Sequence, residues 1–330
     1  MMSKKLISQK VGAVIIGRNE GLRLVRCLES LIKNIDIVMY VDSGSTDKSV
    51  DSAKSLGVQV LSLDMSIPFT AARARNEGAT HLMQQYPDLE FIQFVDGDCD
   101  VQSQWIESAN NFLNENTEYA IVCGRRRERF PEASIYNQLC DIEWNTPIGD
   151  ALACGGDALI RIESFREVDG YNEELIAGEE PEMCFRLRQQ GWKIRRIDVE
   201  MTLHDAAMTK LSQWWKRTIR TGYAFALGSS IHGKSKERYY VKENQRIIIW
   251  GLVMPIVIFG LTILNPISAA LFFVYWAQIV RVAVKRPSLG KMKFIWAASV
   301  VLGKFPEAVG LIQYNINKAT KTRAQIIEYK

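Results

Sequence analysis

The chain has 330 residues, a mild net charge of +4 and the composition of a globular protein. It is long enough for one large or two ordinary domains, and its small charge argues against binding nucleic acid through a basic surface. Six scattered cysteines without a CxxC pair predict reduced thiols rather than a disulfide framework or a zinc site. The basic N-terminus is followed by an apolar run too short for a signal peptide, so we expect the N-terminal part to stay in the cytosol.

Short β-branched runs alternate with segments of helical spacing in the first half of the chain. The predicted strands are 11–16, 35–41, 58–63 and 90–95, and the predicted helices are 21–33, 47–56, 71–86 and 104–115. This alternation is typical of βαβ units and predicts a mostly parallel sheet that is covered by helices on both sides. Ligands of such sheets bind beyond the carboxyl ends of the strands. Polar clusters follow the first, second and fourth predicted strands, namely "GRNEG", "DSGSTD" and "DGDCD".

The second half mixes short strands with helices and then becomes apolar. Helices are predicted over 181–191 and 209–232, and no charged residue occurs between Ile247 and Val280. This uncharged stretch holds two limbs of about 17 residues, roughly 25 Å of helix each, at the short end for crossing a bilayer. Basic residues on both flanks place both ends on the cytosolic side. We therefore expect a transmembrane or re-entrant hairpin, with a buried helical pair of a soluble core as the alternative.

The last apolar stretch, 294–316, is interrupted by Lys304, Pro306 and Glu307. These interruptions favour an amphipathic segment at the membrane interface over a third span. The expected domains are an α/β domain, a basic juxtamembrane linker, a helical hairpin, and an interfacial helix with a basic tail, over 1–232, 233–246, 247–284 and 285–330.

Three aspartates, Asp96, Asp98 and Asp100, follow the fourth predicted strand on every second residue. Carboxylates at the end of a strand point into the crevice beyond the sheet, and ligands that are all oxygen favour Mg²⁺ or Mn²⁺ over zinc. Such a metal can neutralise the charge of a departing diphosphate, and Gly97 would let the backbone come close. A solvated surface turn is the alternative interpretation of a DxD pattern by itself.

Two further strand ends carry polar side chains. Asn19 and Glu20 follow the first predicted strand, and Asp42 follows the second, where a carboxylate can bond ribose hydroxyls or a base edge. The next residues, 45–47, form a good helix start, so we assign them mainly to capping. Arg75 lies in the first turns of a predicted helix, where a guanidinium is suited to a phosphate.

Taken in order, these motifs resemble the inverting family 2 glycosyltransferases, which have a GT-A fold. The resemblance covers roughly 11–205 and rests on "NEG", "DSGSTD", "ARNEGA", "DGDCD", "GGDALIRIESFREVDGYNEEL" and "GEEPEMCFRLRQQGW". It implies a UDP- or GDP-sugar donor and a divalent cation, Mn²⁺ or Mg²⁺, at Asp96 and Asp98. The donor-binding residues that it implies are Asn19, Glu20, Asp42, Arg75, Asn76, Asp96 and Gly97.

The resemblance also implies a catalytic base. Members of this family usually carry Glu-Asp before the "RLRxxGW" helix, and the aspartate deprotonates the acceptor hydroxyl. Here the pair is Glu179 and Glu180, so Glu180 takes the position of the aspartate. The longer side chain leaves open which of the two reaches the hydroxyl, and both could instead only favour a helix N-terminus.

The remaining candidates are implied on the metal and acceptor sides. His204 is a possible ligand of the metal or diphosphate, with a structural histidine as the alternative. Gly155, Gly156 and Asp157 resemble an acceptor-side loop, in which Asp157 would bond a sugar hydroxyl. Trp214 lies in "QWWKR", which partly resembles the QxxRW motif of processive synthases, although it fits a core or membrane-interface position equally well. With one hairpin following, we do not expect processive extrusion.

The sequence thus favours a membrane-attached transferase on the cytoplasmic face of the cell (inner) membrane. Its expected acceptor is a lipid-linked or polysaccharide precursor, membrane lipid is an expected partner, and nucleic acid is not. A polyprenyl-phosphate sugar synthase is one alternative, because a phosphate acceptor scarcely needs a base. A catalytically silent scaffold that binds nucleotide sugars is another. A transporter is poorly supported, since an uncharged hairpin offers no polar path.

Overall fold

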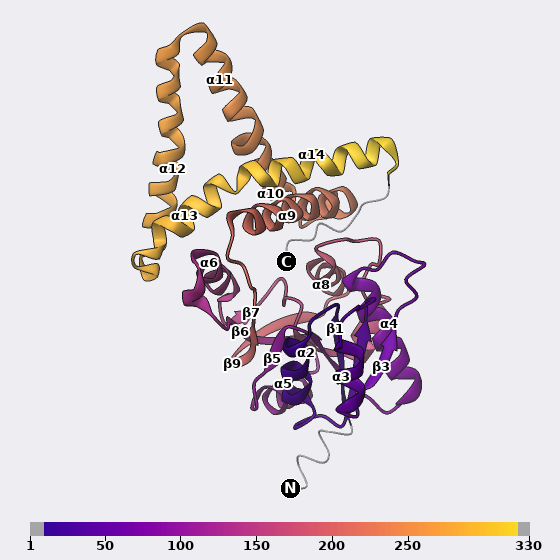
Figure 1. Ribbon diagram of the computed structural model, residues 1–330. Coiled ribbons are helices and arrows are strands. Elements are labelled where there is room, and N and C mark those ends of the chain that lie inside the picture. The colour runs from indigo at the N-terminus through magenta and orange to yellow at the C-terminus, as the bar shows by residue number, and fades with distance from the viewer. Residues whose placement is uncertain (1–9, 323–330) are drawn as a thin grey trace. The chain divides into compact units, whose positions relative to one another are not determined.

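The computed structural model describes residues 10–322, and the chain divides into two compact units, Met1–Thr209 and Lys210–Lys330 (Figure 1). The expectations for the basic N-terminal segment, 1–9, and for the end of the basic tail, 323–330, lie outside the described residues.

The first unit is built on one mixed sheet. The described residues form nine strands in the order β3-β2-β1-β4-β8-β6-β9-β5, and β7 pairs with β9. Their bounds are β1 Val11–Gly17, β2 Ile37–Asp42, β3 Gln59–Ser62, β4 Phe91–Asp96, β5 Cys99–Val101, β6 Tyr119–Glu128, β7 Gly149–Asp150, β8 Ala158–Arg161 and β9 Lys193–His204. The strands predicted in the first half are confirmed, and they pair in parallel. The expectation of a mostly parallel sheet holds for these strands and for β6 beside β9. In contrast, β8 runs antiparallel to both β4 and β6, and β5 and β7 run antiparallel to β9.

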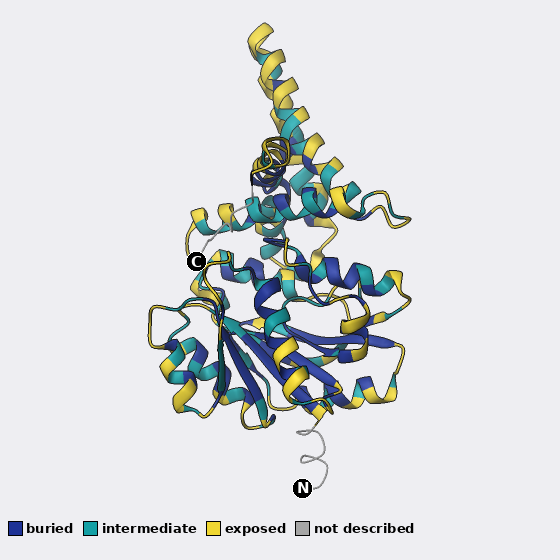
Figure 2. Ribbon diagram, turned by 90° about the vertical axis from the view of Figure 1, so that its right-hand side faces the viewer, coloured by how far each residue is buried: buried dark blue, intermediate teal, exposed yellow. Residues whose placement is uncertain are grey.

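Helices cover the sheet of the first unit. They are α2 Leu22–Leu31, α3 Ser49–Ser55, α4 Ala71–Gln85, α5 Trp105–Glu115, α6 Ile135–Trp144, α7 Ile162–Glu167 and α8 Glu179–Gln189, with a 3₁₀ turn at Pro131–Ala133. Val11, Ala13, Val14 and Ile15 of β1 are all fully buried, as expected for a strand with helices on both faces. Figure 2 shows the buried strands between helices whose outer faces are exposed.

Helix α8 begins two residues earlier than its sequence pattern predicts. Gly178 precedes it with a left-handed φ of 79°, and Pro181 lies in its first turn, where the missing N–H costs no hydrogen bond. Gly191 follows its C-terminus with a φ of 93°, a conformation that favours glycine. The early start places Glu179 and Glu180 at the first two helical positions.

The second unit is helical throughout its ordered elements. These are α9 Leu211–His232, α10 Val241–Ile247, a π-helical turn at Ile248–Val253, α11 Met254–Leu264, a 3₁₀ segment at Pro266–Phe272, α12 Phe273–Val284, a 3₁₀ turn at Pro287–Leu289, α13 Met292–Leu302 and α14 Lys304–Thr320. Within the described residues, three helices are long and apolar enough to cross a membrane, namely Val241–Leu264, Pro266–Val284 and Met292–Thr320.

Helix α9 packs along α14, and Figure 1 shows both crossing the foot of the α11–α12 hairpin. Glycines permit this approach, because a Cβ at Gly222 would overlap the backbone of Glu307 and one at Gly310 would overlap Ile219. We expected the first domain to reach residue 232, whereas the first compact unit ends at Thr209. The packing against α14 is why α9 groups with the helices that follow it.

Candidate active site

The carboxyl ends of β1, β2 and β4 lie side by side, as the predicted βαβ order requires. Asp42 at the end of β2 is in register with Gly17 of β1, and Asp96 at the end of β4 is in register with Ile16. Two of the three polar clusters therefore flank the third at one edge of the sheet.

Arg75 joins two of the predicted motifs. Its side chain is 3% exposed, and it donates from Nη2 to Asp96 Oδ1 over 2.7 Å and from Nη1 to Glu179 Oε1 over 2.9 Å. The guanidinium also lies 5.4 Å from the centre of the Tyr171 ring. Burial alone would lower the pKa of Arg75, but Asp96 and Glu179 raise it above its ordinary value, so the side chain stays charged. Arg75, which we expected to suit a phosphate, thus joins Asp96 at the end of β4 to Glu179 at the start of α8.

Asp96 is held by a second arginine that the sequence reading missed. Arg126 lies 3.6 Å from Asp96 Oδ2 and 2.8 Å from Asp157 Oδ2. Burial alone would raise the pKa of the Asp96 carboxyl, but Arg75 and Arg126 outweigh it, and the pKa lies below its ordinary value. The run of arginines at the end of β6 marks Arg126 as a candidate in the sequence, but it does not indicate which carboxylates Arg126 contacts.

Asp157 is an internal residue of the site. It is fully buried, accepts from the Asp96 backbone N–H over 3.0 Å and accepts from the Thr202 hydroxyl over 2.8 Å. A Cβ at Gly156 would come within 2.9 Å of both the Arg75 and Asp96 side chains. Gly155 adopts a left-handed φ of 85°. These contacts hold Asp157 and Gly156 against Asp96, and a sugar contact by Asp157 stays a prediction.

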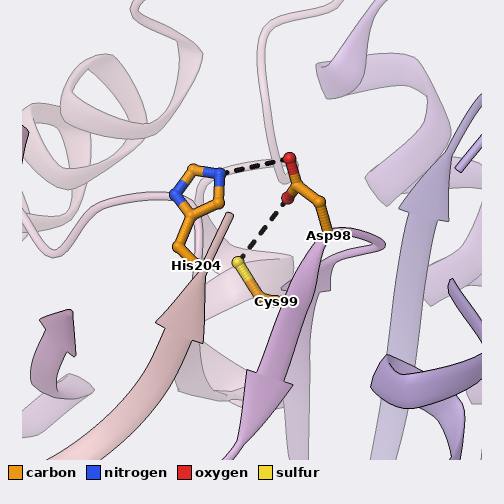
Figure 3. A group of neighbouring side chains, drawn as sticks. All are labelled: Asp98, Cys99 and His204. Atoms are coloured by element: carbon orange, nitrogen blue, oxygen red, sulfur yellow. Dashed lines mark hydrogen bonds and ion pairs between the residues drawn. The ribbon is translucent and has the colours of Figure 1, made fainter. Parts of the chain in front are cut away.

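Asp98 meets His204 across the β5–β9 pair. The two residues lie 3.2 Å apart between Oδ2 and Nε2, and the Cys99 thiol lies 3.7 Å from Asp98 Oδ1 (Figure 3). Trp144 stacks on the imidazole, with ring centres 4.6 Å apart, and so fixes the plane of the ring. The third aspartate, Asp100, turns instead to an ion pair with Arg129.

The donor set at Asp98 fits a hard divalent cation. Single ligand atoms of Asp98, Cys99 and His204 lie within 4.8 Å of one another. Burial raises the pKa of the Cys99 thiol well above its ordinary value, so it does not offer the thiolate that zinc favours. A carboxylate and an imidazole remain, which suit Mn²⁺ or Mg²⁺ when oxygen ligands of a substrate complete the shell. A role of Asp96 as a ligand of the same metal stays a prediction, since two arginines already contact its carboxylate.

Glu180 contacts Cys154 in the loop before β8. Its Oε1 accepts from the backbone N–H of Cys154 over 2.6 Å, and the thiols of Cys154 and Cys184 lie 3.1 and 3.0 Å away. Glu179 is instead paired with Arg75. The two adjacent glutamates therefore have different environments, which the sequence could not distinguish.

The residues after β1 and β2 mainly build the loop between them. Asp42 accepts from Tyr40 over 2.9 Å and from the backbone N–H groups of Gly44 and Ser45, each over 3.0 Å. Asn19 Oδ1 accepts from the backbone N–H of Thr46 over 2.7 Å. These bonds order the loop that a nucleoside would contact, so binding by Asn19 and Asp42 stays a prediction.

The predicted cap of the next helix was wrong in position. Helix α3 starts at Ser49, later than expected, and Asp47 Oδ1 accepts from the Ser49 backbone N–H over 2.9 Å. Ser45 Oγ instead accepts from the Asn19 backbone N–H over 2.9 Å. Lys48 therefore occupies the N-cap position without a side-chain cap, and Asp47 bonds the first helical N–H from the preceding residue.

Glu20 and Gly97 pack at the same strand end. Glu20 pairs with Arg23 over 2.8 Å, and a Cβ at Gly97 would lie 3.2 Å from the Ile16 carbonyl and 3.3 Å from Glu20 Cγ. The close approach that Gly97 permits is therefore to β1. Donor contacts by Glu20 and Gly97 remain predictions.

Two other candidates belong to different surroundings. Asn76 donates to the Tyr171 carbonyl over 2.8 Å and to Glu173 over 2.9 Å, and its Oδ1 accepts from the Tyr171 N–H. Its amide therefore holds the loop between α7 and α8, and a donor contact by Asn76 stays a prediction. Trp214 lies on α9 in the second unit, 6.5 Å from Trp215 between ring centres.

The double contact of Arg75 predicts a large loss of stability on its removal. Arg75→Met leaves the buried Glu179 without its cation and removes the closer of two cations from the half-buried Asp96, so we expect the free energy of unfolding to fall by about 3–5 kcal/mol. Arg127→Met is the matched control, because Arg127 pairs with Glu200 at the surface and should contribute no more than about 1 kcal/mol. Urea unfolding of both variants measures the difference, and equal losses would contradict the bridging role.

Comparisons with known proteins find sequence similarity to glycosyltransferases in the first unit. Residues 13–167 match the family described as Glycosyl transferase family 2. An "uncharacterized glycosyltransferase" of Rickettsia bellii (strain RML369-C) is 48% identical over 58 residues, which are 17% of this chain and 19% of that protein. One of Rickettsia felis (strain ATCC VR-1525 / URRWXCal2) is 42% identical over 53 residues, 16% of this chain and 19% of that protein. The matches thus span about a fifth of these curated relatives.

Solved structures share the fold. The mannosyltransferase PcManGT from Pyrobaculum calidifontis, in complex with GDP-Man and Mn²⁺, has a TM-score of 0.60 at 15% identity and covers 92% of this chain and 87% of its own. TarS 1-349 of S. aureus has a TM-score of 0.51 at 14% identity and covers 97% and 95%. The mixed sheet agrees with the GT-A arrangement expected from the motifs. The match to Glycosyl transferase family 2 thus covers residues 13–167, just under half of the chain, and the solved structures share its fold.

Proposed function

We propose that this chain is a metal-dependent, inverting glycosyltransferase that moves a sugar from a nucleotide-sugar donor to a hydroxyl acceptor. The contact that carries the proposal is the bridge from Arg75 to Asp96 and Glu179, because it brings the DxD strand end and the glutamate pair into one site. Single displacement needs these two elements together, namely a place for the departing diphosphate and a base for the incoming hydroxyl.

Asp98 and His204 would hold the divalent cation, with Asp96 beside them. Mn²⁺ or Mg²⁺ bound there supplies positive charge to the diphosphate as it departs. Arg75 and Arg126 add fixed positive charge next to Asp96 at the same strand end. The complex of the mannosyltransferase neighbour with GDP-Man and Mn²⁺ supports a GDP-sugar donor, and a UDP-sugar is the other candidate.

Glu180 is the base in this proposal. Glu179 Oε1 accepts from Arg75, which keeps that carboxylate engaged, whereas Glu180 is held by neutral donors. Glu180 takes the proton of the acceptor hydroxyl while the acceptor oxygen bonds to the anomeric carbon. The bond from that carbon to the diphosphate oxygen breaks, and its electron pair leaves with the diphosphate, so the configuration inverts.

The second unit would attach the chain to the cytoplasmic face of the cell (inner) membrane, where a lipid-linked or polysaccharide precursor is the acceptor. In the most apolar stretches of Val241–Leu264 and Pro266–Val284, 17% and 11% of residues are buried, against 39% in Met292–Thr320. The first two form the α11–α12 hairpin, which we propose to insert into the bilayer. Helix α14 packs on α9, whose Arg217 and Arg220 suit the headgroup region, so we propose an interfacial position for α14.

Replacement of the base gives the direct test of the transfer reaction. Glu180→Gln should lower turnover by about 10²–10⁴-fold while the affinity for donor is kept, because the amide cannot accept the proton. Glu182→Gln is the control on the same helix, where Glu182 pairs with Arg186 over 2.8 Å and should keep turnover. Nucleotide release and calorimetric binding measure the two effects. Full activity of Glu180→Gln would instead favour a phosphate acceptor, as in a polyprenyl-phosphate sugar synthase, and no turnover of any nucleotide sugar by the native chain would favour a silent scaffold.

Metal removal tests the role of Asp98. A chelator should abolish nucleotide release, and Mn²⁺ or Mg²⁺ should restore it. In Asp98→Asn, the Mn²⁺ concentration for half-maximal activity should rise at least about tenfold, since a charged ligand is lost. Asp100→Asn is the matched control, with the same charge change two residues away at an aspartate paired with Arg129. Calorimetric Mn²⁺ binding that is equal in both variants would exclude Asp98 as a ligand.

Membrane extraction tests the hairpin. Inserted apolar helices resist alkaline carbonate, so the native chain should stay with the membrane fraction. A triple change of Ile256, Phe259 and Ile263 to Ser should release it, because these side chains are 65–70% exposed on α11. Leu22→Ser removes an equally exposed apolar side chain from the first unit and should leave retention unchanged. Release of the native chain by carbonate would contradict insertion.

A further inference from the structure

Two cysteines converge on one oxygen of Glu180. Cys184 Sγ lies 3.0 Å and Cys154 Sγ lies 3.1 Å from Glu180 Oε1, and the Cys154 backbone N–H donates to the same oxygen over 2.6 Å. Cys184 comes from the next turn of α8, while Cys154 comes from the loop before β8. In the described range 10–322, Glu180 Oε2 has no hydrogen-bond partner. The cluster thus engages one carboxylate oxygen and leaves the other available.

The chemistry of this cluster favours donors over metal ligands. Burial raises the pKa of the Cys184 thiol to about 11 and that of the Cys154 thiol well above its ordinary value. Both therefore keep their protons near neutrality, and a protonated thiol donates a hydrogen bond but is a poor metal ligand. The two sulfur atoms are 3.7 Å apart, whereas a disulfide needs about 2.05 Å. The Cys154 thiol is nearer to Glu180 than to its other acceptor, the Gly155 carbonyl at 3.4 Å.

We propose that Cys154 and Cys184 are positioning residues for the base. Their thiols and the Cys154 N–H hold Oε1 of Glu180, so that Oε2 receives the proton of the attacking hydroxyl. This inference rests on the proposed function. The inference adds to that function the contacts that fix Glu180, which stands where the family usually has an aspartate. Glutamate has one more rotatable bond than aspartate, and three donors on one oxygen limit its conformational freedom.

The thiol and the phenol that lie near Glu180 carry no charge. Cys123 of β6 and Tyr171, in the loop before α8, both have a pKa above the ordinary value, mainly through burial, and so stay neutral. The adjacent Glu179 is engaged by Arg75. The three donors are therefore the contacts that hold Glu180 Oε1.

The test follows the pH dependence of donor hydrolysis, in which water replaces the acceptor. The full chain is assayed for release of GDP from GDP-mannose and of UDP from UDP-glucose with Mn²⁺. In the double variant Cys154→Ala/Cys184→Ala, the acidic limb of kcat should move up by roughly half to one pH unit, with a three- to tenfold loss below it. The sign follows because hydrogen bonds to a carboxylate lower its pKa, so removing them raises it. Above the limb, turnover should approach the native value, and binding of GDP with Mn²⁺ should be unchanged.

Controls separate positioning from simple packing. Cys140→Ala removes a buried thiol on α6, away from Glu180 in the sequence, and should lower stability without moving the acidic limb. Cys154→Ser and Cys184→Ser keep a hydrogen-bond donor, so their limb should stay at or below the native pH even if the alanine variant fails to fold. The proposal would be overturned if the acidic limb of kcat stayed at the native pH in the double alanine variant. It would also be overturned if that limb moved to higher pH in a serine variant.

The failure of this inference is distinguishable from that of the proposed function. If the native chain releases no nucleotide, or if Glu180→Gln is fully active, the proposed function itself fails. If Glu180→Gln is inactive while all cysteine variants keep the native pH profile, Glu180 remains the base and only the role of the thiols is rejected.

Discussion

The site depends on one buried cation shared by two carboxylates. Arg75 contacts Asp96 at the end of β4 and Glu179 at the start of α8, so a single guanidinium joins a strand end to a helix start. Burying Arg75 and Glu179 and half-burying Asp96 removes charge from water at a cost, and close, directional contacts offset that cost. Arginine donates to the two partners from separate nitrogens of a planar fork, a geometry that the single nitrogen of lysine cannot reproduce. The bridge thus ties the strand end beside the proposed metal ligands to the helix start that carries the proposed base.

Fixed charges of both signs surround Asp96. Arg126 lies between Asp96 and Asp157, and Asp157 also receives the Asp96 backbone N–H. A buried network in which each charge has a partner is stiff and is already oriented before a ligand arrives. This arrangement suits a site that receives a diphosphate, because its positive charges need little rearrangement when the leaving group develops negative charge.

The second unit shows two kinds of helix surface. The α11–α12 hairpin exposes large apolar side chains, including Ile263 and Phe273, at 70% and 72%. Helices α9 and α14 bury their contact faces against each other through Gly222 and Gly310. In water, the exposed apolar surface of the hairpin would be unfavourable, whereas the α9–α14 pair is supported by its own packing. In the proposed membrane attachment, the hairpin lies within the bilayer and α14 lies at its interface.

The sequence by itself determined the early strands, the polar clusters at their ends, the uncharged hairpin and the candidates Asp98 and Glu180, because hydrophobic periodicity and short motifs are local signals. Only the tertiary structure decided which charges are paired. Arg75 and Glu179 are 104 residues apart, and Asp96 and Asp157 are 61 apart, so no local pattern reports their contact. The antiparallel direction of β8 escaped for the same reason, since strand pairing is a long-range property. The two adjacent glutamates differ only through the partners that folding brings to them.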